Sequence, residues 1–487
     1  MDIEEQTAED LQAAVRRHER SCEELTSRYL ERIERFNPRY NAVVLLNPRA
    51  LSDARALDAR LAAGEPPGPL AGLPLVIKDS VDVAGLPTTA GWAPLSKAAG
   101  GHALRPEQDA PVVARLRAAG AVILGKTNVP AFSYDLTRTD SSWAGPTLNA
   151  VCPALAPGAS SAGTATAVSG NLAFAGLAEE TAGSIQNPAA AQQLVGIKPT
   201  FGLVPTEGAV PLSASARDVI GPHARTVRDA ALLLGVMAGQ SLQAGAYLAG
   251  LRRGALQGRR LGLYGPGWRD QAPSAETQRL YARALDDLRA LGGVLIEDPF
   301  AGSGFAAAVR ALPGSLGFEC LPHDLDRYLR RHPHGPAPSL AALRRLGGRD
   351  PFAAGEVLGD LRHRLAAALA APEALPDLRR FHAARADLRG RVDRVLDTHT
   401  LDALVFPQRL GDLPPLHGPD DIQATTVSEI NVAGLPGVTV PAGQHASGAP
   451  FALIFVGRAW SEARLLALAH DYEQATRHRA APRLLPP

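Results

Sequence analysis

The sequence predicts one large α/β domain whose central, twisted, mixed, mostly parallel β-sheet is covered by helices on both faces. Short apolar runs typical of strands alternate with helical patterns along the 487 residues, and no break in composition separates them. The chain is 46% hydrophobic and 20% charged, so it can bury a core of this size. We find no internal repeat, which argues against a solenoid or propeller.

The elements of the first half follow from spacing and from turn residues. The pattern predicts, in chain order, a helix over 8–36 that Asn37-Pro38 ends, a buried strand at 75–78, a helix and a strand over 112–125, and a small-residue helix and strand over 164–178 that Glu179-Glu180 close. A Gly/Pro-rich linker at 64–74 separates the first helix from the first strand. Residues 1–63 therefore form an N-terminal helical segment, and residues 64–245 form a core.

The second half continues the same alternation. It predicts strands at 261–265 and 294–298 around a helix at 274–291, a mostly helical stretch over 302–400, strands at 401–407, 434–443 and 451–457, and a closing helix at 460–476. A Gly/Pro loop near 240–255 is the one place where a domain boundary could lie. Residues 401–476 form the C-terminal strands and helix of the same domain.

Charge and cysteine content exclude several classes of function. The formal net charge is +1, whereas nucleic acids and anionic membranes select basic proteins, so we expect neither as a partner. No apolar run approaches the ~18–20 residues that span a bilayer, and the acidic first residues do not resemble a signal peptide. Cys22, Cys152 and Cys320 show no CxxC spacing, so we expect reduced thiols and a cytoplasmic protein.

Histidine and metal chemistry have little support in the pattern. The chain has 13 histidines, but none lies in a recognisable catalytic loop, and the Gly-x-Ser-x-Gly motif is absent. His332 and His334 lie in a charged, proline-broken stretch without a carboxylate companion. We therefore expect neither a metal nor a cofactor.

The cationic residues are strongly biased toward arginine. Of the 50 Lys and Arg residues, only Lys78, Lys97, Lys126 and Lys198 are lysines. A buried lysine can lose its proton, whereas an arginine cannot, so a retained lysine can act as a base for a serine nucleophile. Lys78 ends the apolar run LPLVIK, where burial is expected.

Each lysine also has a structural alternative. For Lys78 it is a buried ion pair with Asp79 or Asp82, although arginine would serve that role equally well. Lys126 and Lys198 follow apolar runs, where we expect them to brace loops by hydrogen bonds. Lys97 has the surroundings of a solvated lysine.

Several ordered motifs resemble the amidase signature family. The resemblance covers most of 1–245 and about 400–476, and it rests on LPLVIKDSVDVAGLPTTAGW (73–92), GKTNVPAFSY (125–134), GPTLN (145–149), APGASSAGTATAVSGNLAFAGLAEETAGSIQNPAA (156–190), VGIKPTFGLVPTEGAVPLSASARDVIGPHARTVRDAALLL (195–234), GLPGVTVPAG and GAPFALIFVGRAWSEARLLALA.

This resemblance implies a Ser-cisSer-Lys catalytic triad. Lys78 corresponds to the family's catalytic lysine, Ser160 to its bridging serine on a cis peptide, and Ser184 to its nucleophile. The two serines lie 24 positions apart, as in the family. The backbone N–H groups of Thr181, Ala182, Gly183 and Ser184 would form the oxyanion hole.

The sequence also departs from the family pattern. The motif G-G-S-S-G-G-S is GASSAGT here, and D-x-G-G-S-I-R is Glu180-Thr-Ala-Gly-Ser184-Ile-Gln186. We expect Ala182 to alter the oxyanion loop slightly and Glu180 to hydrogen-bond Gln186. All three triad residues are retained.

The resemblance implies an amidase that hydrolyses a linear or cyclic carboxamide, nylon-oligomer-like amides included, other than a peptide bond. Alternatives are the glutaminase subunit of a tRNA-dependent amidotransferase, although GSIQNPA differs from its G-S-I-R-Q-P-A, and a non-catalytic binding protein on the same scaffold. Phe132, Tyr134 and Cys320 are candidate substrate-binding residues; the alternatives are aromatic core packing for Phe132 and Tyr134 and a buried thiol for Cys320. The 302–400 insert is expected to shape the pocket. The partner would be a small-molecule amide. The oligomeric state stays open, a homodimer included.

Overall fold

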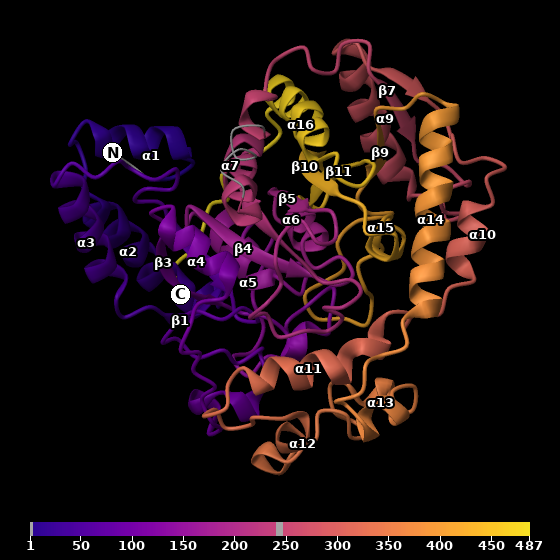
Figure 1. The fold of residues 1–487 in the computed structure, drawn as a ribbon. Helices are drawn as coiled ribbons and strands as arrows, with labels where there is room; N and C mark the ends of the chain where they lie inside the picture. Colours follow the sequence, from indigo (N-terminus) through magenta and orange to yellow (C-terminus); the bar gives the residue numbers. More distant parts are fainter. Residues whose placement is uncertain (1–2, 240–246) are drawn as a thin grey trace.

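The computed structural model describes residues 3–239 and 247–487, and its centre is an eleven-stranded sheet (Figure 1). The strands lie in the order β1-β3-β2-β4-β6-β5-β10-β11-β9-β7-β8. Their bounds are β1 (Val43–Leu46), β2 (Pro74–Lys78), β3 (Val122–Thr127), β4 (Ala175–Glu180), β5 (Val195–Lys198), β6 (Val219–Ala224), β7 (Arg260–Leu263), β8 (Val294–Ile296), β9 (Ala403–Pro407), β10 (Gly437–Gln444) and β11 (Pro450–Val456). A single sheet therefore takes strands from both sides of the boundary considered near 240–255, of which residues 240–246 lie outside the described residues.

The prediction of one mixed α/β sheet is confirmed, but the expectation that it is mostly parallel is wrong. Six of the ten neighbouring strand pairs are antiparallel, and four are parallel. Strands buried on both faces give continuous apolar runs, which are typical of parallel sheets. These runs carry no information on strand direction, so the antiparallel centre from β4 to β9 could not be distinguished from a parallel arrangement.

Helices cover both faces of the sheet. Their bounds are α1 (Ala8–Arg16), α2 (Cys22–Tyr40), α3 (Ala50–Ala62), α4 (Pro111–Ala118), α5 (Ala162–Ser169), α6 (Gln186–Ala191), α7 (Val227–Ala238), α9 (Ala275–Ala290), α10 (Phe305–Arg310), α11 (Leu321–Arg330), α12 (Leu340–Leu343), α13 (Ala366–Ala370), α14 (Arg379–Thr398), α15 (Val427–Ala433) and α16 (Glu462–Thr476). Leu453 and Phe455 of β11 join the core that α9 and α16 cover, whereas Ile454 and Val456 join the core under α14 and α15. This alternation is the period of two that a strand imposes. No helix among the described residues is long and apolar enough to cross a membrane.

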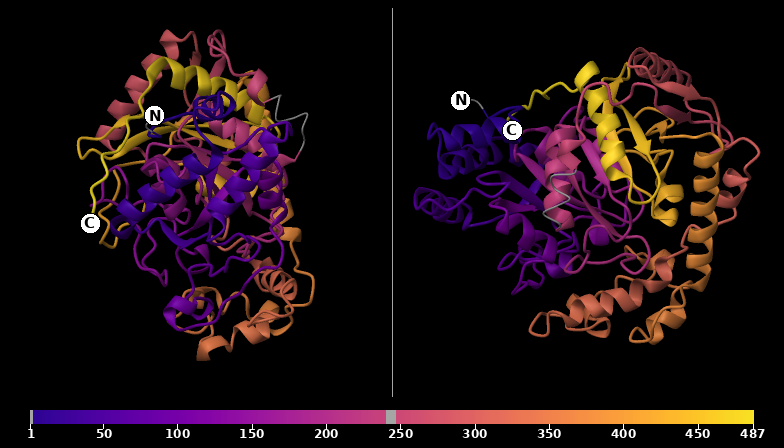
Figure 2. Two further views of the ribbon diagram at one scale, coloured as in Figure 1. Left: turned by 90° about the vertical axis from the view of Figure 1, so that its left-hand side faces the viewer. Right: turned by 45° about the horizontal axis from the view of Figure 1, so that its top comes forward.

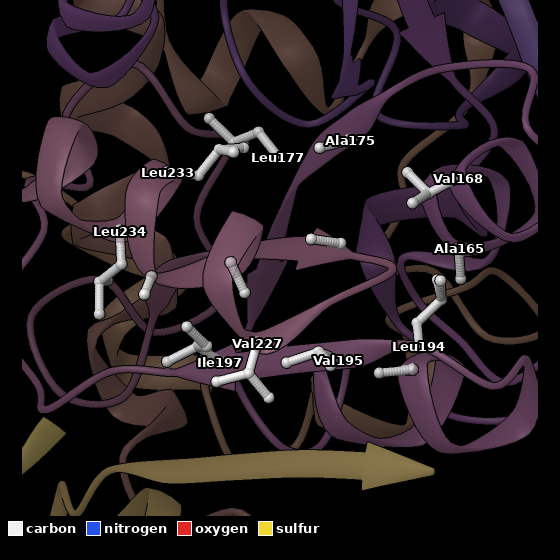
Figure 3. Packing of buried hydrophobic residues seen from close by; sticks show 14 of the residues in the cluster. Ala165, Val168, Ala175, Leu177, Leu194, Val195, Ile197, Val227, Leu233 and Leu234 are labelled. Carbon is white, nitrogen blue, oxygen red and sulfur yellow. The ribbon is translucent and has the colours of Figure 1, made fainter. Parts of the chain in front are cut away.

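The largest core holds β4 and β5 against their covering helices. Figure 3 shows members of this cluster from β4, β5, α5 and α7, among them Val168, Leu177, Ile197 and Leu234. These side chains are at most 1% exposed. The segment that leads from β4 into α6 therefore starts from a rigid part of the molecule.

In the N-terminal segment, two helices, α1 and α2, lie where the sequence predicted one run over 8–36. α1 ends at Arg16, and α2 starts anew behind Ser21, whose side chain accepts from the N–H of Glu24 while Glu24 caps Ser21 in return. Pro38 lies inside α2, which continues to Tyr40 and ends at Asn41 in the left-handed conformation. The C-terminal tail returns to this segment, where Arg479 pairs with Glu5 at 2.8 Å (Figure 2).

The 302–400 region is mostly helical, as predicted, with turns between its helices. α11, α12 and α13 lie below the sheet in Figure 1, and α14 runs upward beside it. Leu325 and Leu340 of this region share a separate hydrophobic cluster with Trp92 and Phe132. The insert thus packs against a loop of the core.

Candidate active site

Lys78 is the last residue of β2, and its side chain is completely buried. Its Nζ donates to Ser160 Oγ at 2.7 Å, to Glu179 Oε2 at 2.8 Å and to the Glu179 carbonyl oxygen at 2.9 Å. β2 pairs with β4 in parallel, which brings the end of β2 beside Glu179. Three acceptors therefore surround the amine, and one of them is the hydroxyl of a candidate catalytic serine.

The ion-pair partners considered for Lys78 were wrong. Asp79 pairs with Lys126 instead, at 3.1 Å, and Asp82 accepts from the hydroxyls of Thr88 and Tyr328. The observed partner, Glu179, was not identified from the sequence. Its signal was a carboxylate at the end of a fully buried strand, where an unpaired charge is costly.

Two effects shift the pKa of Lys78 in opposite directions. Burial lowers the pKa of Lys78, whereas the carboxylate of Glu179 acts to raise it. Asp218 lies nearby, and burial together with the charge of Glu179 raises the pKa of Asp218 to about 8. The Thr181 hydroxyl donates to Asp218 Oδ1 at 2.6 Å and lies 3.4 Å from Glu179 Oε1. Two buried carboxyl groups are thus linked to the lysine.

Ser160 lies just before α5, and the peptide bond between Ala159 and Ser160 is cis. The next serine, Ser161, donates to the Glu179 carbonyl oxygen at 3.1 Å. Two glycines flank this pair of serines at positions where a side chain would be too close to neighbouring atoms. A Cβ at Gly158 would lie 2.6 Å from Pro188 Cα, and one at Gly163 would lie 2.3 Å from the Asn128 nitrogen.

The alanines that depart from the family pattern lie where alanine fits. Ala159, Ala162 and Ala182 are absent from the described residues with positive φ, whereas Gly183 has φ +112°. A Cβ at Gly183 would lie 2.7 Å from Val427 Cγ2. The turn of this loop therefore depends on the glycine that the chain keeps.

Ser184 lies between β4 and α6 on the loop that Thr181 opens. No hydrogen bond among the described residues uses its hydroxyl or the backbone N–H groups of Thr181, Ala182, Gly183 and Ser184. The structure thus brings Lys78 and Ser160 into contact and leaves Ser184 without a hydrogen bond to either. These four amides are available to a ligand.

Glu180 anchors the far side of the loop. Its Oε2 accepts from the N–H groups of Ile185 at 2.7 Å and Gln186 at 3.1 Å, and its Oε1 accepts from Gln186 Nε2 at 2.5 Å. The expected bond between Glu180 and Gln186 is therefore present. Asn431 Nδ2 adds a fourth donor at 2.7 Å, which ties the loop to α15.

The three candidate substrate-binding residues lie in different surroundings. Phe132 is 2% exposed, with its ring centroid 5.3 Å from that of Trp92, so it belongs to a core. Tyr134 is half-buried, packs edge-on against Phe318 and donates to Asp360 at 2.8 Å. Cys320 is buried, and its Sγ donates to the Gly317 carbonyl oxygen at 3.1 Å.

Lys126 and Lys198 brace loops, as the sequence predicted. Besides its pair with Asp79, Lys126 donates to the Pro87 carbonyl and to Thr88 Oγ1. Lys198 donates to the carbonyl oxygens of Pro199 at 3.1 Å and Leu435 at 2.8 Å.

Within residues 3–239 and 247–487, one group of side chains could hold a metal ion. Glu276, Asp412 and His445 place one ligand atom each within 4.8 Å of one another. None of them is a candidate catalytic residue.

Comparison with known proteins defines the class. The sequence profile described as Amidase matches residues 24–466. A glutamyl-tRNA(Gln) amidotransferase subunit from Halorhodospira halophila is 35% identical over 508 aligned positions, covering 97% of this chain and 98% of the relative. The crystal structure of native peptide amidase from Stenotrophomonas maltophilia is 34% identical, with a TM-score of 0.79 and 99% coverage of both chains. The 6-aminohexanoate cyclic dimer hydrolase, at 24% identity and a TM-score of 0.77, shares the fold.

A match over most of the chain, with a full-length relative above 30% identity, shows the family. The chain belongs to the amidase family, whose members hydrolyse carbon–nitrogen bonds.

Proposed function

We propose that the chain hydrolyses a carboxamide through an acyl-enzyme on Ser184. The observation that carries this proposal is the buried 2.7 Å contact between Lys78 Nζ and Ser160 Oγ. Ser184 lies nearby in the chain, on the loop that follows strand β4. Lys78 is the general base in this proposal, Ser160 carries the proton, and Ser184 is the nucleophile.

The first half of the reaction forms the ester. Ser184 Oγ attacks the amide carbon while its proton passes to Ser160, whose own proton passes to the neutral amine of Lys78. The free N–H groups of Thr181, Ala182, Gly183 and Ser184 stabilise the oxyanion; losing one such donor costs ~10²–10³ in rate. The C–N bond then breaks, and the proton returns from Lys78 through Ser160 to the leaving amine.

The second half releases the acid. Water attacks the ester carbonyl and gives its proton to the same relay, and the Ser184–acyl bond breaks with return of the proton to Ser184. The products are a carboxylic acid and an amine or ammonia. The substrate is a small-molecule amide, linear or cyclic.

A second candidate, the glutaminase subunit of a tRNA-dependent amidotransferase, is favoured by the full-length relative from H. halophila. Against it, this chain reads GSIQNPA after the oxyanion loop. The likeness to a peptide amidase at equal coverage favours an amidase over an amidotransferase subunit. A non-catalytic binding protein was suggested by the lost glycines, and that argument weakens because Ala159, Ala162 and Ala182 need no positive φ.

The test is turnover of the purified chain on a panel of primary, aryl and cyclic amides, without partner proteins or tRNA. The proposal expects hydrolysis of at least one class, and loss of it in Ser184→Ala with the fold retained by circular dichroism. Activity on glutamine only when the other amidotransferase components are added would favour the second candidate. Equal activity in Ser184→Ala would contradict the mechanism.

A further inference from the structure

Arg217 is a buried cation whose Nε has no hydrogen-bond partner among the described residues. Its side chain belongs to a residue only 4% exposed, and among the described residues none accepts a hydrogen bond from the guanidinium or forms an ion pair with it. The ring of Phe318 lies 5.5 Å from the guanidinium carbon. Burial lowers the pKa of Arg217 to about 10, while the charges of Glu319 and Asp218 act to raise it. A cation–π contact leaves the buried Nε–H without an acceptor. Buried arginines are ordinarily paired, so this exception calls for a ligand.

The carboxylates whose charges act on Arg217 accept hydrogen bonds from other groups, and neither forms an ion pair with the guanidinium. Asp218 accepts from Thr181 and from the N–H groups of Leu212 and Ser213. Glu319 accepts from the Gly317 N–H at 2.5 Å. Arg385, a neighbouring guanidinium, donates to the Val432 and Ala216 carbonyl oxygens, so it adds positive charge.

Arg217 lines a cavity of about 240 Å³, whose other charged groups are paired. Arg269 pairs with Glu429 at 2.7 Å, and Arg310 pairs with Asp270. These two pairs cancel within the cavity lining, so Arg217 gives the lining one excess positive charge; the Glu319 and Asp218 carboxylates that act on it lie outside the lining. This cavity is smaller than the ~300–1,000 Å³ of sites that bind drug-sized ligands, so it fits a small ligand with a short carbon chain.

The cavity adjoins the oxyanion loop from two directions. On one side, Ser428 of α15 lines the cavity, and its neighbour Val427 is the residue that limits space at Gly183. On the other side, Arg217 precedes Asp218, which accepts the hydroxyl of Thr181 in that loop. A substrate with its amide at Ser184 can therefore extend toward Arg217.

We propose that Arg217 binds a carboxylate of the substrate, so that the amide cleaved at Ser184 carries a carboxylate at the end of a short chain. This rests on the proposed function. A guanidinium binds a carboxylate through two parallel N–H bonds, which would satisfy donors that no side chain nearby accepts from. Gly317 leaves space for a carboxylate beside Arg217 Nε, because a Cβ at this position would lie 3.1 Å from that nitrogen.

The experiment compares length-matched amides on the full chain: the monoamides succinamate, glutaramate and adipamate against butanamide, pentanamide and hexanamide. We expect kcat/KM of at least one monoamide to exceed that of its neutral match about tenfold or more. Arg217→Met should lower that value by about 10- to 100-fold, as the loss of a charge-assisted pair does, and leave the neutral amides within about threefold. Arg217→Lys should restore part of the preference.

Arg409→Met is the matched control, because Arg409 is equally buried, also has an unpartnered nitrogen, and lies outside the cavity lining. It should leave the ratio of the two substrate series unchanged. Equal losses on both series in Arg217→Met, or a wild-type preference for neutral amides, would overturn the proposal.

A binding measurement tests the anion site independently of amide hydrolysis. Calorimetry of glutarate with Ser184→Ala should detect binding that Arg217→Met in the same background abolishes. If the wild type cleaves no amide, the proposed function fails while this binding still supports the anion site. If neutral amides are cleaved but glutarate does not bind, only the anion site fails.

Discussion

Lys78 Nζ lies 2.8 Å from Glu179 Oε2, and both side chains are buried. The same nitrogen lies 2.7 Å from Ser160 Oγ and donates to it when Lys78 is protonated; when Lys78 is neutral, the hydroxyl can donate to the amine across the same contact. The carboxylate stabilises the protonated form. Burial lowers the pKa of Lys78, and Glu179 acts against that shift, so Glu179 helps to determine the pH at which Lys78 can accept a proton.

Glu179→Gln should move the acidic limb of the pH profile of kcat/KM to lower pH. Activity requires neutral Lys78, so it rises as pH rises through the pKa of this residue. The Glu179 carboxylate raises that pKa, and its removal therefore lowers it. The pH profile on one amide, with exposed Glu34→Gln as control, measures the shift. A limb that stays in place or moves to higher pH would contradict this role.

Lys78→Arg should lose activity although it keeps the positive charge. A guanidinium cannot give up its proton at working pH, so the general-base contribution of ~10²–10⁴-fold is lost. Steady-state kcat measures the loss, and thermal denaturation tests whether the fold survives. Near wild-type turnover in folded Lys78→Arg would exclude the lysine as base.

Gly183→Ala should lower kcat by ~10²-fold or more, because the oxyanion loop would have to move. Its φ is +112°, and the added Cβ would lie 2.7 Å from Val427 Cγ2. Ala182→Gly is the matched control at the neighbouring position, where φ is not positive, and we expect little change in its kcat. Equal kcat values in the two variants would show that the loop does not depend on Gly183.

Lys126→Met should destabilise the fold by ~3–5 kcal/mol, because Asp79 would remain buried without its partner at 3.1 Å. Exposed Lys97→Met should change stability by no more than ~0.5 kcal/mol. Urea unfolding at neutral pH gives both free energies of unfolding. Similar values for the two variants would mean that the pair with Asp79 contributes little.

Much of the fold could be predicted from local patterns. The apolar runs around Ile77, Val405 and Leu453 form strands β2, β9 and β11, as predicted. Short apolar runs between turn residues are typical of buried strands. Strand direction could not be predicted, because it depends on which distant segments pair. The break between α1 and α2 had a local signal in the capping box of Ser21 and Glu24.

The site could be predicted where a single residue carried the signal. Lys78 stood out because the chain uses arginine almost everywhere else, and the structure places it against Ser160. Glu179 and Arg217 could not be assigned from the sequence, since their surroundings arise from the pairing of β2 with β4 and from the packing of the 302–400 insert.

The most direct test of the account is to label the chain with a serine-reactive fluorophosphonate and to locate the adduct by peptide mass spectrometry. We expect one adduct on Ser184, its absence in Ser184→Ala, and much slower labelling in Lys78→Arg. An adduct on Ser160 or Ser161, or labelling that persists in Ser184→Ala, would contradict the assignment of Ser184 as the nucleophile.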